Sequence, residues 1–264
     1  MFRGETVKIL LIFIPFVIGQ TSSASLKIGS GKDAKPGENL DYVVLNIVFQ
    51  NQGQKCGGTL IASQYVLTSA TCVFDPVEGI ATAINVTFPQ YRPTEFVNYN
   101  LKVYIHPTYN STTHADDVAI IKLTTPMIPD GKSISIARLG INSTADVYVD
   151  DLVRACGMGS IGNYPRPPKV LQCTELNVVP AKSCNSNSKI ICTQWPDRDN
   201  NMCNGDYGGP IYSFTDSIDG MKLTVIGIAQ YSPDYRTGSS CLDAHKVSHA
   251  QVASYIDWLA ATLI

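Results

Sequence analysis

Residues 56–61 read CGGTLI and residues 66–72 read VLTSATC, and these two stretches decide how the chain folds. Thr59–Ala62 and Tyr65–Thr68 are short runs rich in β-branched and aromatic residues, which favour extended strands. Similar runs, separated by Gly, Asn, Pro and Ser, continue on both sides: Tyr42–Gln50, Val97–Ile105, Val118–Leu123, Val147–Ala155, Val170–Val179, Ile211–Phe214 and Leu223–Tyr231. The sequence therefore predicts an all-β protein.

A helical period occurs only near the C-terminus. Apolar residues fall there at i, i+3, i+4, i+7 and i+11, which places them on one stripe of a helix. These residues are Val252, Tyr255, Ile256, Leu259 and Leu263. We therefore expect two β-rich halves closed by one helix over about residues 250–262.

The first 24 residues have the layout of a secretory signal peptide. Arg3 and Lys8 precede the apolar run at residues 9–19, and the small residues 22–24 follow it. Such a run is too short to span a bilayer comfortably, although an uncleaved anchor is the alternative. No other stretch is long and apolar enough to cross a membrane, so we expect an extracellular protein with no membrane partner.

Charge and cysteine content narrow the class further. Residues 1–24 hold two of the 20 basic and one of the 22 acidic residues, so the rest has a formal net charge of −3. No basic cluster suggests a nucleic-acid partner. Eight cysteines in an exported chain predict four disulfides, whose pairing spacing alone leaves open. Three sequons, at Asn85, Asn110 and Asn142, are candidate glycosylation sites.

Several longer motifs, taken together, resemble the trypsin-like serine proteases. CGGTLI and VLTSATC are similar to the family's CGGSLI and VLTAAHC, and residues 116–123, DDVAIIKL, to NDIALIKL. Residues 203–210, CNGDYGGP, resemble CQGDSGGP, and residues 106–110, HPTYN, precede Asp117 at the family's spacing of eleven residues. The resemblance implies two six-stranded antiparallel β-barrels of the chymotrypsin type, over about 28–136 and 137–250, followed by the C-terminal α-helix.

The same resemblance places a degenerate catalytic triad at Thr71, Asp117 and Tyr207. In the family a histidine removes the proton of a serine hydroxyl, and a buried aspartate orients that histidine. Thr71 stands at the histidine position and has no basic nitrogen, while the phenol of Tyr207 replaces the serine. Only Asp117 is kept. We therefore expect a pseudoprotease without peptidase activity.

The resemblance also implies an occluded specificity pocket. Asn201 stands where trypsins have an aspartate, and a residue larger than glycine occupies positions 232 and 247. The ring of Tyr207 is expected over the same entrance. The residues expected to form the occluded pocket are Asn201, Tyr207, Gln230, Tyr231, Ser232 and Val247.

Proteolytic processing in the family frees an amine that pairs with the aspartate at position 206. Lys27-Ile28 stands at the family's cleavage site, which implies a short propeptide over residues 25–27 and a mature domain over 28–264. Gly29 and Ser30 depart from the family pattern, so cleavage here stays open.

The family pattern implies the pairs Cys56–Cys72, Cys184–Cys192 and Cys203–Cys241. The strands that carry Cys156 and Cys173 run side by side in this fold, which predicts a fourth bridge between them. The loop between Cys184 and Cys192 is shorter than in active relatives.

The four histidines suggest neither a metal site nor a substitute base. His106 matches the family's structural histidine, and His245 and His249 lack partners at metal-ligand spacing. His114 lies three residues before Asp117, and we expect it to be a solvated loop histidine. We expect no metal and no cofactor.

The motif details most resemble mite group 3 trypsins and the inactivated serine protease paralogues of the scabies mite. This resemblance implies a parasite protein, secreted into the gut lumen, that binds host plasma complement proteins and so serves immune evasion. We expect a monomer. Two alternatives stay open, which are residual or novel hydrolysis and a non-catalytic cofactor homologue that regulates an active protease cascade.

Overall fold

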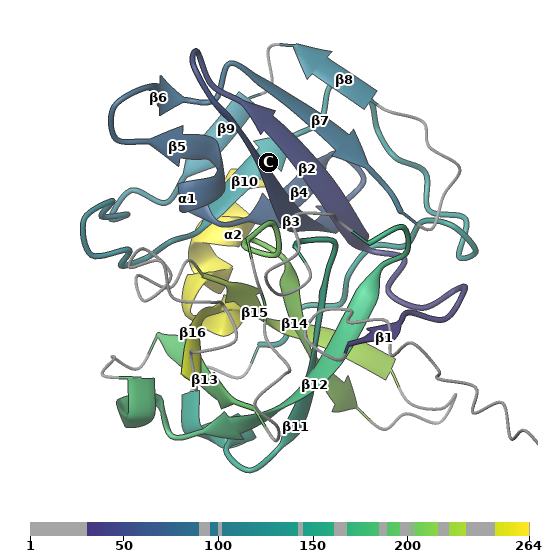
Figure 1. Ribbon diagram of the computed structural model, residues 1–264, viewed down its shortest axis with the longest axis vertical. Coiled ribbons are helices and arrows are strands. Elements are labelled where there is room, and N and C mark those ends of the chain that lie inside the picture. The colour runs from purple at the N-terminus through teal and green to yellow at the C-terminus, as the bar shows by residue number, and fades with distance from the viewer. Residues whose placement is uncertain are drawn as a thin grey trace, which may run out of the picture.

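This computed structural model describes residues 31–89, 96–99, 102–141, 145–160, 168–184, 189–195, 202, 204–215, 222–230 and 246–263. Their strands form two large sheets, one from each half of the chain, and Figure 1 shows these one above the other. A two-stranded ribbon of β5 (Phe74–Asp75) and β6 (Gly79–Ile80) is attached to the N-terminal sheet. The described part of the chain is therefore mostly β, as the sequence predicted.

The C-terminal sheet contains a closed barrel. Its strands are β1 (Lys32–Asp33), β11 (Leu152–Gly157), β12 (Gln172–Val179), β13 (Ile190–Gln194), β14 (Pro210–Thr215), β15 (Lys222–Ala229) and β16 (Lys246–Gln251). Six of them close into a ring because β12 pairs with both β11 and β13. The seventh, β1, adds to β12 from the N-terminal side of the chain.

The N-terminal sheet is a half-barrel, so of the two predicted six-stranded barrels the structure shows one as a closed ring and one as an open, barrel-like sheet. Its order is β8 (Phe96–Tyr99), β7 (Ala83–Thr87), β2 (Tyr42–Val48), β3 (Gly53–Ala62), β4 (Tyr65–Thr68), β10 (Ala119–Lys122) and β9 (Lys102–Ile105). The predicted strand Val97–Ile105 is present in two pieces, β8 and β9, which lie at opposite edges of the sheet. Among the described residues, β8 and β9 do not pair with each other, so this sheet does not close into a ring.

Two other elements differ from the sequence prediction. The first residues of the predicted strand Val147–Ala155 form a 3₁₀ turn, Ala145–Tyr148, and β11 begins only at Leu152. Asp150 between them has a φ of 70°, a left-handed conformation that interrupts an extended strand. The predicted helix begins as strand β16 and the 3₁₀ turn Val252–Tyr255, and only α2 (Ile256–Thr262) is α-helical.

A single apolar cluster joins the two sheets. Tyr42, Leu67 and Ile120 of the N-terminal sheet belong to it together with Tyr212 of the C-terminal barrel and Leu259 of α2. All five side chains are no more than 2% exposed. Burial of such side chains stabilises a fold by about 1.5–3 kcal/mol each. The two halves are therefore held together by a common core as well as by the chain that links them.

Three of the four predicted disulfides are present. They are Cys56–Cys72, Cys156–Cys173 and Cys184–Cys192, and each bridge over loops of this length typically contributes about 3 kcal/mol. The predicted pair Cys203–Cys241 lies outside the described residues, as do the signal peptide at 1–24, the cleavage site at Lys27-Ile28 and the sequon at Asn142. Among the described residues, no helix has the length and apolar character needed to cross a membrane.

The two remaining sequons differ in how far they are exposed. Asn110 is exposed, and its Oδ1 accepts hydrogen bonds from the N–H groups of Thr112 and Thr113. Asn85 is half-buried in β7, and its Oδ1 is shielded from solvent. Of the two, Asn110 is the better candidate for glycosylation.

Candidate functional site

The one-turn helix α1 (Ala70–Val73) presents Thr71 to the buried carboxylate of Asp117. The backbone N–H of Thr71 donates to Asp117 Oδ1 at 2.7 Å, and its hydroxyl donates to Oδ2 at 3.0 Å. Asp117 is fully buried at the start of the segment that leads into β10. Burial raises the pKa of this carboxyl to about 6, although the two hydrogen bonds from Thr71 lower it.

Tyr109 and His114 complete a hydrogen-bonded cluster around Thr71. The Thr71 Oγ1 lies 3.1 Å from the Tyr109 hydroxyl and 3.3 Å from Nδ1 of His114. Because the only hydroxyl proton of Thr71 points to Asp117, its lone pairs face the Tyr109 O–H and an Nδ1–H of His114. His114 is therefore half-buried against Thr71, and the prediction of a solvated loop histidine is wrong.

The backbone of the loop bends sharply to bring His114 to this position. His114 and Asp116 have φ values of 54° and 52°, in the left-handed region that few residues other than glycine adopt. Such conformations persist only where surrounding contacts hold them. No signal in the sequence pointed to this bend, because histidine and aspartate are ordinary loop residues.

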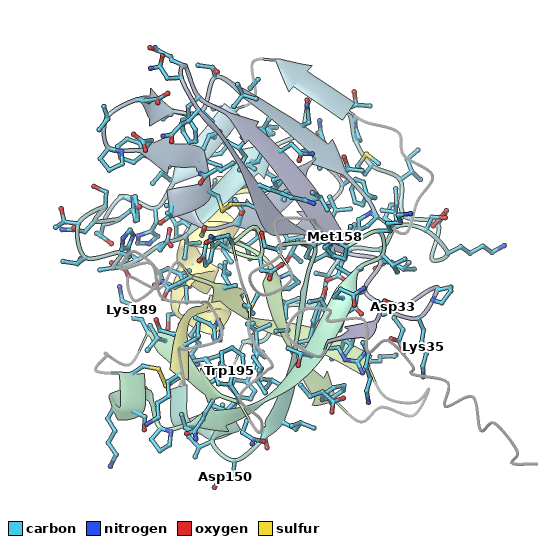
Figure 2. The ribbon with its side chains drawn as sticks, viewed as in Figure 1. Asp33, Lys35, Asp150, Met158, Lys189 and Trp195 are labelled. Atoms are coloured by element: carbon cyan, nitrogen blue, oxygen red, sulfur yellow. A yellow bond between two sulfur atoms is a disulfide. The ribbon has the colours of Figure 1, made fainter. Side chains whose placement is uncertain are left out.

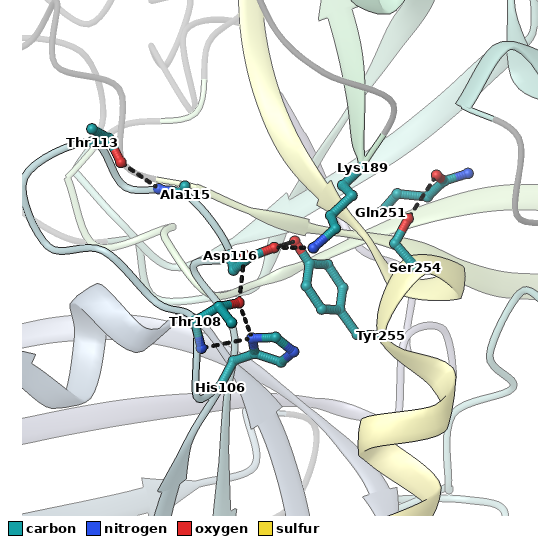
Figure 3. Close-up of polar contacts among 9 residues, drawn as sticks. All are labelled: His106, Thr108, Thr113, Ala115, Asp116, Lys189, Gln251, Ser254 and Tyr255. Carbon is teal, nitrogen blue, oxygen red and sulfur yellow. Dashed lines mark hydrogen bonds and ion pairs between the residues drawn. The ribbon is translucent and has the colours of Figure 1, made fainter.

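The contacts that hold the loop come from the C-terminal part of the chain (Figure 3). Asp116 accepts hydrogen bonds from Lys189 at 2.8 Å, from Tyr255 at 3.1 Å and from Thr108 at 2.6 Å. The ring of His106 packs edge-on against Tyr255 and Trp258, with centroids 5.2 Å and 5.0 Å away. His106 is thus structural, as the family pattern implied, and the network fixes the position of Asp117.

Tyr207 lies in a backbone turn that connects the two sheets. Its carbonyl accepts a hydrogen bond from the N–H of Gly57 in β3 at 2.7 Å, and the next N–H, of Gly208, donates to Ala229 in β15. The side chain is 9% exposed and belongs to the apolar cluster of the N-terminal sheet that includes Cys56 and Cys72. The Tyr207 hydroxyl donates to Asn204 Oδ1 at 3.1 Å.

Thr71 and Tyr207 both line a cavity of about 450 Å³ between the two sheets. The other lining side chains include Gln54, Lys55 and Ser160. Burial lowers the pKa of Lys55, while the negative charge of Asp206 acts in the opposite direction. The region around Thr71 and Tyr207 is therefore a polar recess that contains a threonine, a phenol and an ammonium group, and neither position 71 nor 207 supplies a base.

The structure describes three of the six residues predicted to occlude the specificity pocket, Tyr207, Gln230 and Val247. Val247 is 4% exposed and belongs to a buried apolar cluster with Met202 and Trp195, of which Trp195 lies inside the C-terminal barrel (Figure 2). Gln230, at the end of β15, is 7% exposed. Asn201, Tyr231 and Ser232 lie outside the described residues, so closure of the pocket entrance stays a prediction.

Asp206 is enclosed by a pair of glycines. Its Oδ1 accepts a hydrogen bond from the N–H of Gly159 at 2.6 Å, and the side chain is fully buried. A Cβ atom at Gly157 or Gly159 would collide with this carboxylate, so only glycine fits at both positions.

Among the described residues, no group of three or more His, Cys, Asp or Glu side chains could hold a metal ion.

The raised pKa of Asp117 predicts how stability depends on pH. A carboxyl with a folded pKa of about 6 and an unfolded pKa near 4 stabilises the fold fully below about pH 4. This stability is lost as pH rises through 6, by about 3 kcal/mol at most. The free energy of unfolding of the wild type should fall between about pH 5 and pH 7.5, and it should fall less in Asp117→Asn, as measured by urea denaturation. Equal falls in both proteins would contradict the assignment.

Comparisons with known proteins agree with the fold. The family model for trypsin matches residues 28–259. The venom serine protease of Polistes dominula is 25% identical, over 96% of this chain and 94% of its own length. Granzyme B of Rattus norvegicus is 27% identical over 97% and 99% of the two chains.

Solved structures confirm the fold independently. HL collagenase, 24% identical, superposes with a TM-score of 0.70 over 89% of this chain and 97% of its own. Human heparin binding protein, 20% identical, gives a TM-score of 0.69 over 89% and 96%. The match to the family model covers most of the chain and includes Thr71, Asp117 and Tyr207. This chain therefore belongs to the trypsin family of serine proteases and their homologues.

Proposed function

We propose that this chain is a secreted member of the trypsin family that has no peptidase activity and acts by binding other proteins. The observation that carries the proposal is the hydrogen bonding of Thr71. Its hydroxyl donates to Asp117, so the aspartate that would orient a histidine is occupied by a side chain that cannot accept a proton.

Position 207 supports the same conclusion. The Tyr207 hydroxyl is bonded to Asn204, and a phenol ordinarily ionises only near pH 10, so it is not a nucleophile near neutral pH. Loss of either the serine or the histidine of such a triad costs about a million-fold in turnover. The wasp relative named above is called a serine protease, and this chain has threonine and tyrosine where the family motifs have histidine and serine.

The framework around the lost chemistry is retained, which favours a role in recognition. Three disulfides, the network at Asp116 and the glycines around Asp206 keep the two sheets in the family's arrangement. The disulfides fit an oxidising, extracellular setting. The resemblance to inactivated mite paralogues makes host complement proteins the proposed partners and the gut lumen the proposed site of action.

Two measurements test this function. First, a fluorophosphonate probe should not label the purified mature chain, whereas it should label an active trypsin in the same assay. Second, the immobilised chain should retain serum proteins that trypsin with a chemically blocked active site does not retain, and the soluble chain should reduce complement lysis. Covalent labelling at any residue, or a serum profile identical to that of blocked trypsin, would contradict the proposal.

A further inference from the structure

A second cavity, of about 530 Å³, lies away from the degenerate centre. It is formed where residues 37–41 before β2, the inter-sheet link at 135–138, and strands β11, β14 and β15 meet. It shares no lining residue with the cavity that contains Thr71 and Tyr207. Its volume is in the range of small-molecule binding sites in proteins.

The loop that carries Asn39 forms one wall of this cavity. Asn39 is 5% exposed and its Nδ2 is shielded from solvent, so the amide shapes the wall and does not reach a ligand in the cavity. The φ of 53° at Asn39 shows that the backbone is held in a left-handed turn at this point.

Arg154 provides a charged group on the same lining. Its guanidinium is held 3.3 Å from Glu38 and 3.8 Å from Glu175, and it lies 5.1 Å from the ring centre of Phe214. These contacts leave some of its five N–H donors available to a ligand. Arg138 and Lys222 add exposed positive charge to the lining, so cations outnumber the two lining carboxylates.

The rest of the lining is apolar, with one carboxyl whose charge depends on pH. Leu40, Phe214 and Leu223 supply apolar surface. Asp41 is 7% exposed and accepts a hydrogen bond from the Tyr212 hydroxyl at 3.1 Å. Burial raises the pKa of Asp41 to about 6, so it is mostly ionised at neutral pH and mostly protonated near pH 5.

We propose that this cavity binds a small amphiphilic organic anion, whose charged head contacts Arg154 and Arg138 and whose apolar body packs against Leu40, Phe214 and Leu223. Ionised Asp41 repels such a head, so binding tightens as the pH falls through 6. The other titratable groups that face the cavity or Asp41 are Glu38, Arg138, Arg154, Lys222 and Tyr212.

The probe for this site is 1-octanesulfonate, which stays ionised throughout this pH range, and the measurement is titration calorimetry on the mature chain. We expect saturable binding of one molecule per chain, about fivefold tighter at pH 5 than at pH 7.5. Asp41→Asn should bind equally at both pH values, with the affinity of the wild type at pH 5.

Two further variants keep the test decisive if a buried substitution prevents folding. Arg138→Gln changes an exposed lining residue and should weaken binding about threefold, whereas Lys182→Gln, on the exposed turn Ala181–Cys184, should not change it. Absence of saturable binding would overturn the proposal. Binding that does not depend on pH, or that Arg138→Gln and Lys182→Gln affect equally, would overturn it as well. None of these binding results would test the separate proposal that the chain has no peptidase activity.

Discussion

The double variant Thr71→His with Tyr207→Ser is expected to remain without measurable cleavage after lysine or arginine. It restores the identity of the triad, since Asp117 is already in place within 3.0 Å of the side chain at position 71. The predicted occlusion of the specificity pocket would remain in this variant. Val247 is 4% exposed and belongs to the same buried apolar cluster as Met202 and Trp195, which supports that prediction.

Two obstacles to cleavage, the altered triad and the predicted occlusion of the pocket, can be measured separately with a fluorophosphonate probe and a peptide substrate. On a trypsin peptide substrate, kcat/KM of the double variant should stay at least about 10⁴-fold below that of trypsin. Labelling of the double variant at position 207, without cleavage, would place the remaining barrier in the pocket. The triple variant that adds Val247→Gly is the matched test of that barrier and should cleave faster than the double variant. Efficient cleavage by the double variant itself would show that the pocket is open.

The strands that the sequence predicted best are those with alternating or continuous apolar residues. Tyr65–Thr68 is β4 in full, and Ile211–Phe214 lies within β14, because both are buried and paired on two sides. The predictions failed at Val147–Asp151 and at residues 250–255, where the side chains still suited the predicted element. There, backbone conformation and tertiary pairing decided the outcome, as in the left-handed Asp150 and the pairing of Gln251 with Gly227.

The site was predictable only as far as motifs fix positions along the chain. Thr71 and Asp117 lie in such motifs, and the structure brings them into hydrogen-bond contact. His114 and Trp195 lie in loops outside the motifs, and their places depend on contacts with distant segments. His114 is positioned by a loop that Lys189 and Tyr255 hold from the far end of the chain, which no local pattern reveals.

Replacement of Gly208 by alanine is expected to cause the largest loss of stability of any substitution considered above. Gly208 has a φ of 77°, in which an alanine is strained by about 1 kcal/mol. A Cβ there would also collide with the Thr68 hydroxyl and lie 2.6 Å from the carbonyl oxygen of Gly57. The Thr68 hydroxyl and the Gly57 carbonyl oxygen are hydrogen-bonded to each other across β3 and β4. Because this bond holds both atoms in place, the sheet would have to shift to admit the Cβ.

Together, strain and displacement should lower the free energy of unfolding of Gly208→Ala by about 4 kcal/mol, measured by urea denaturation with the disulfides intact. The matched control is Gly131→Ala. Gly131 has a similar φ of 65°, but a Cβ there would meet no atom within 4 Å. The control should therefore lose only about 1 kcal/mol, the cost of the left-handed backbone alone. Equal losses in the two variants would mean that contact with Thr68 and Gly57 is not what requires glycine, and that the turn carrying Tyr207 can move away from β3.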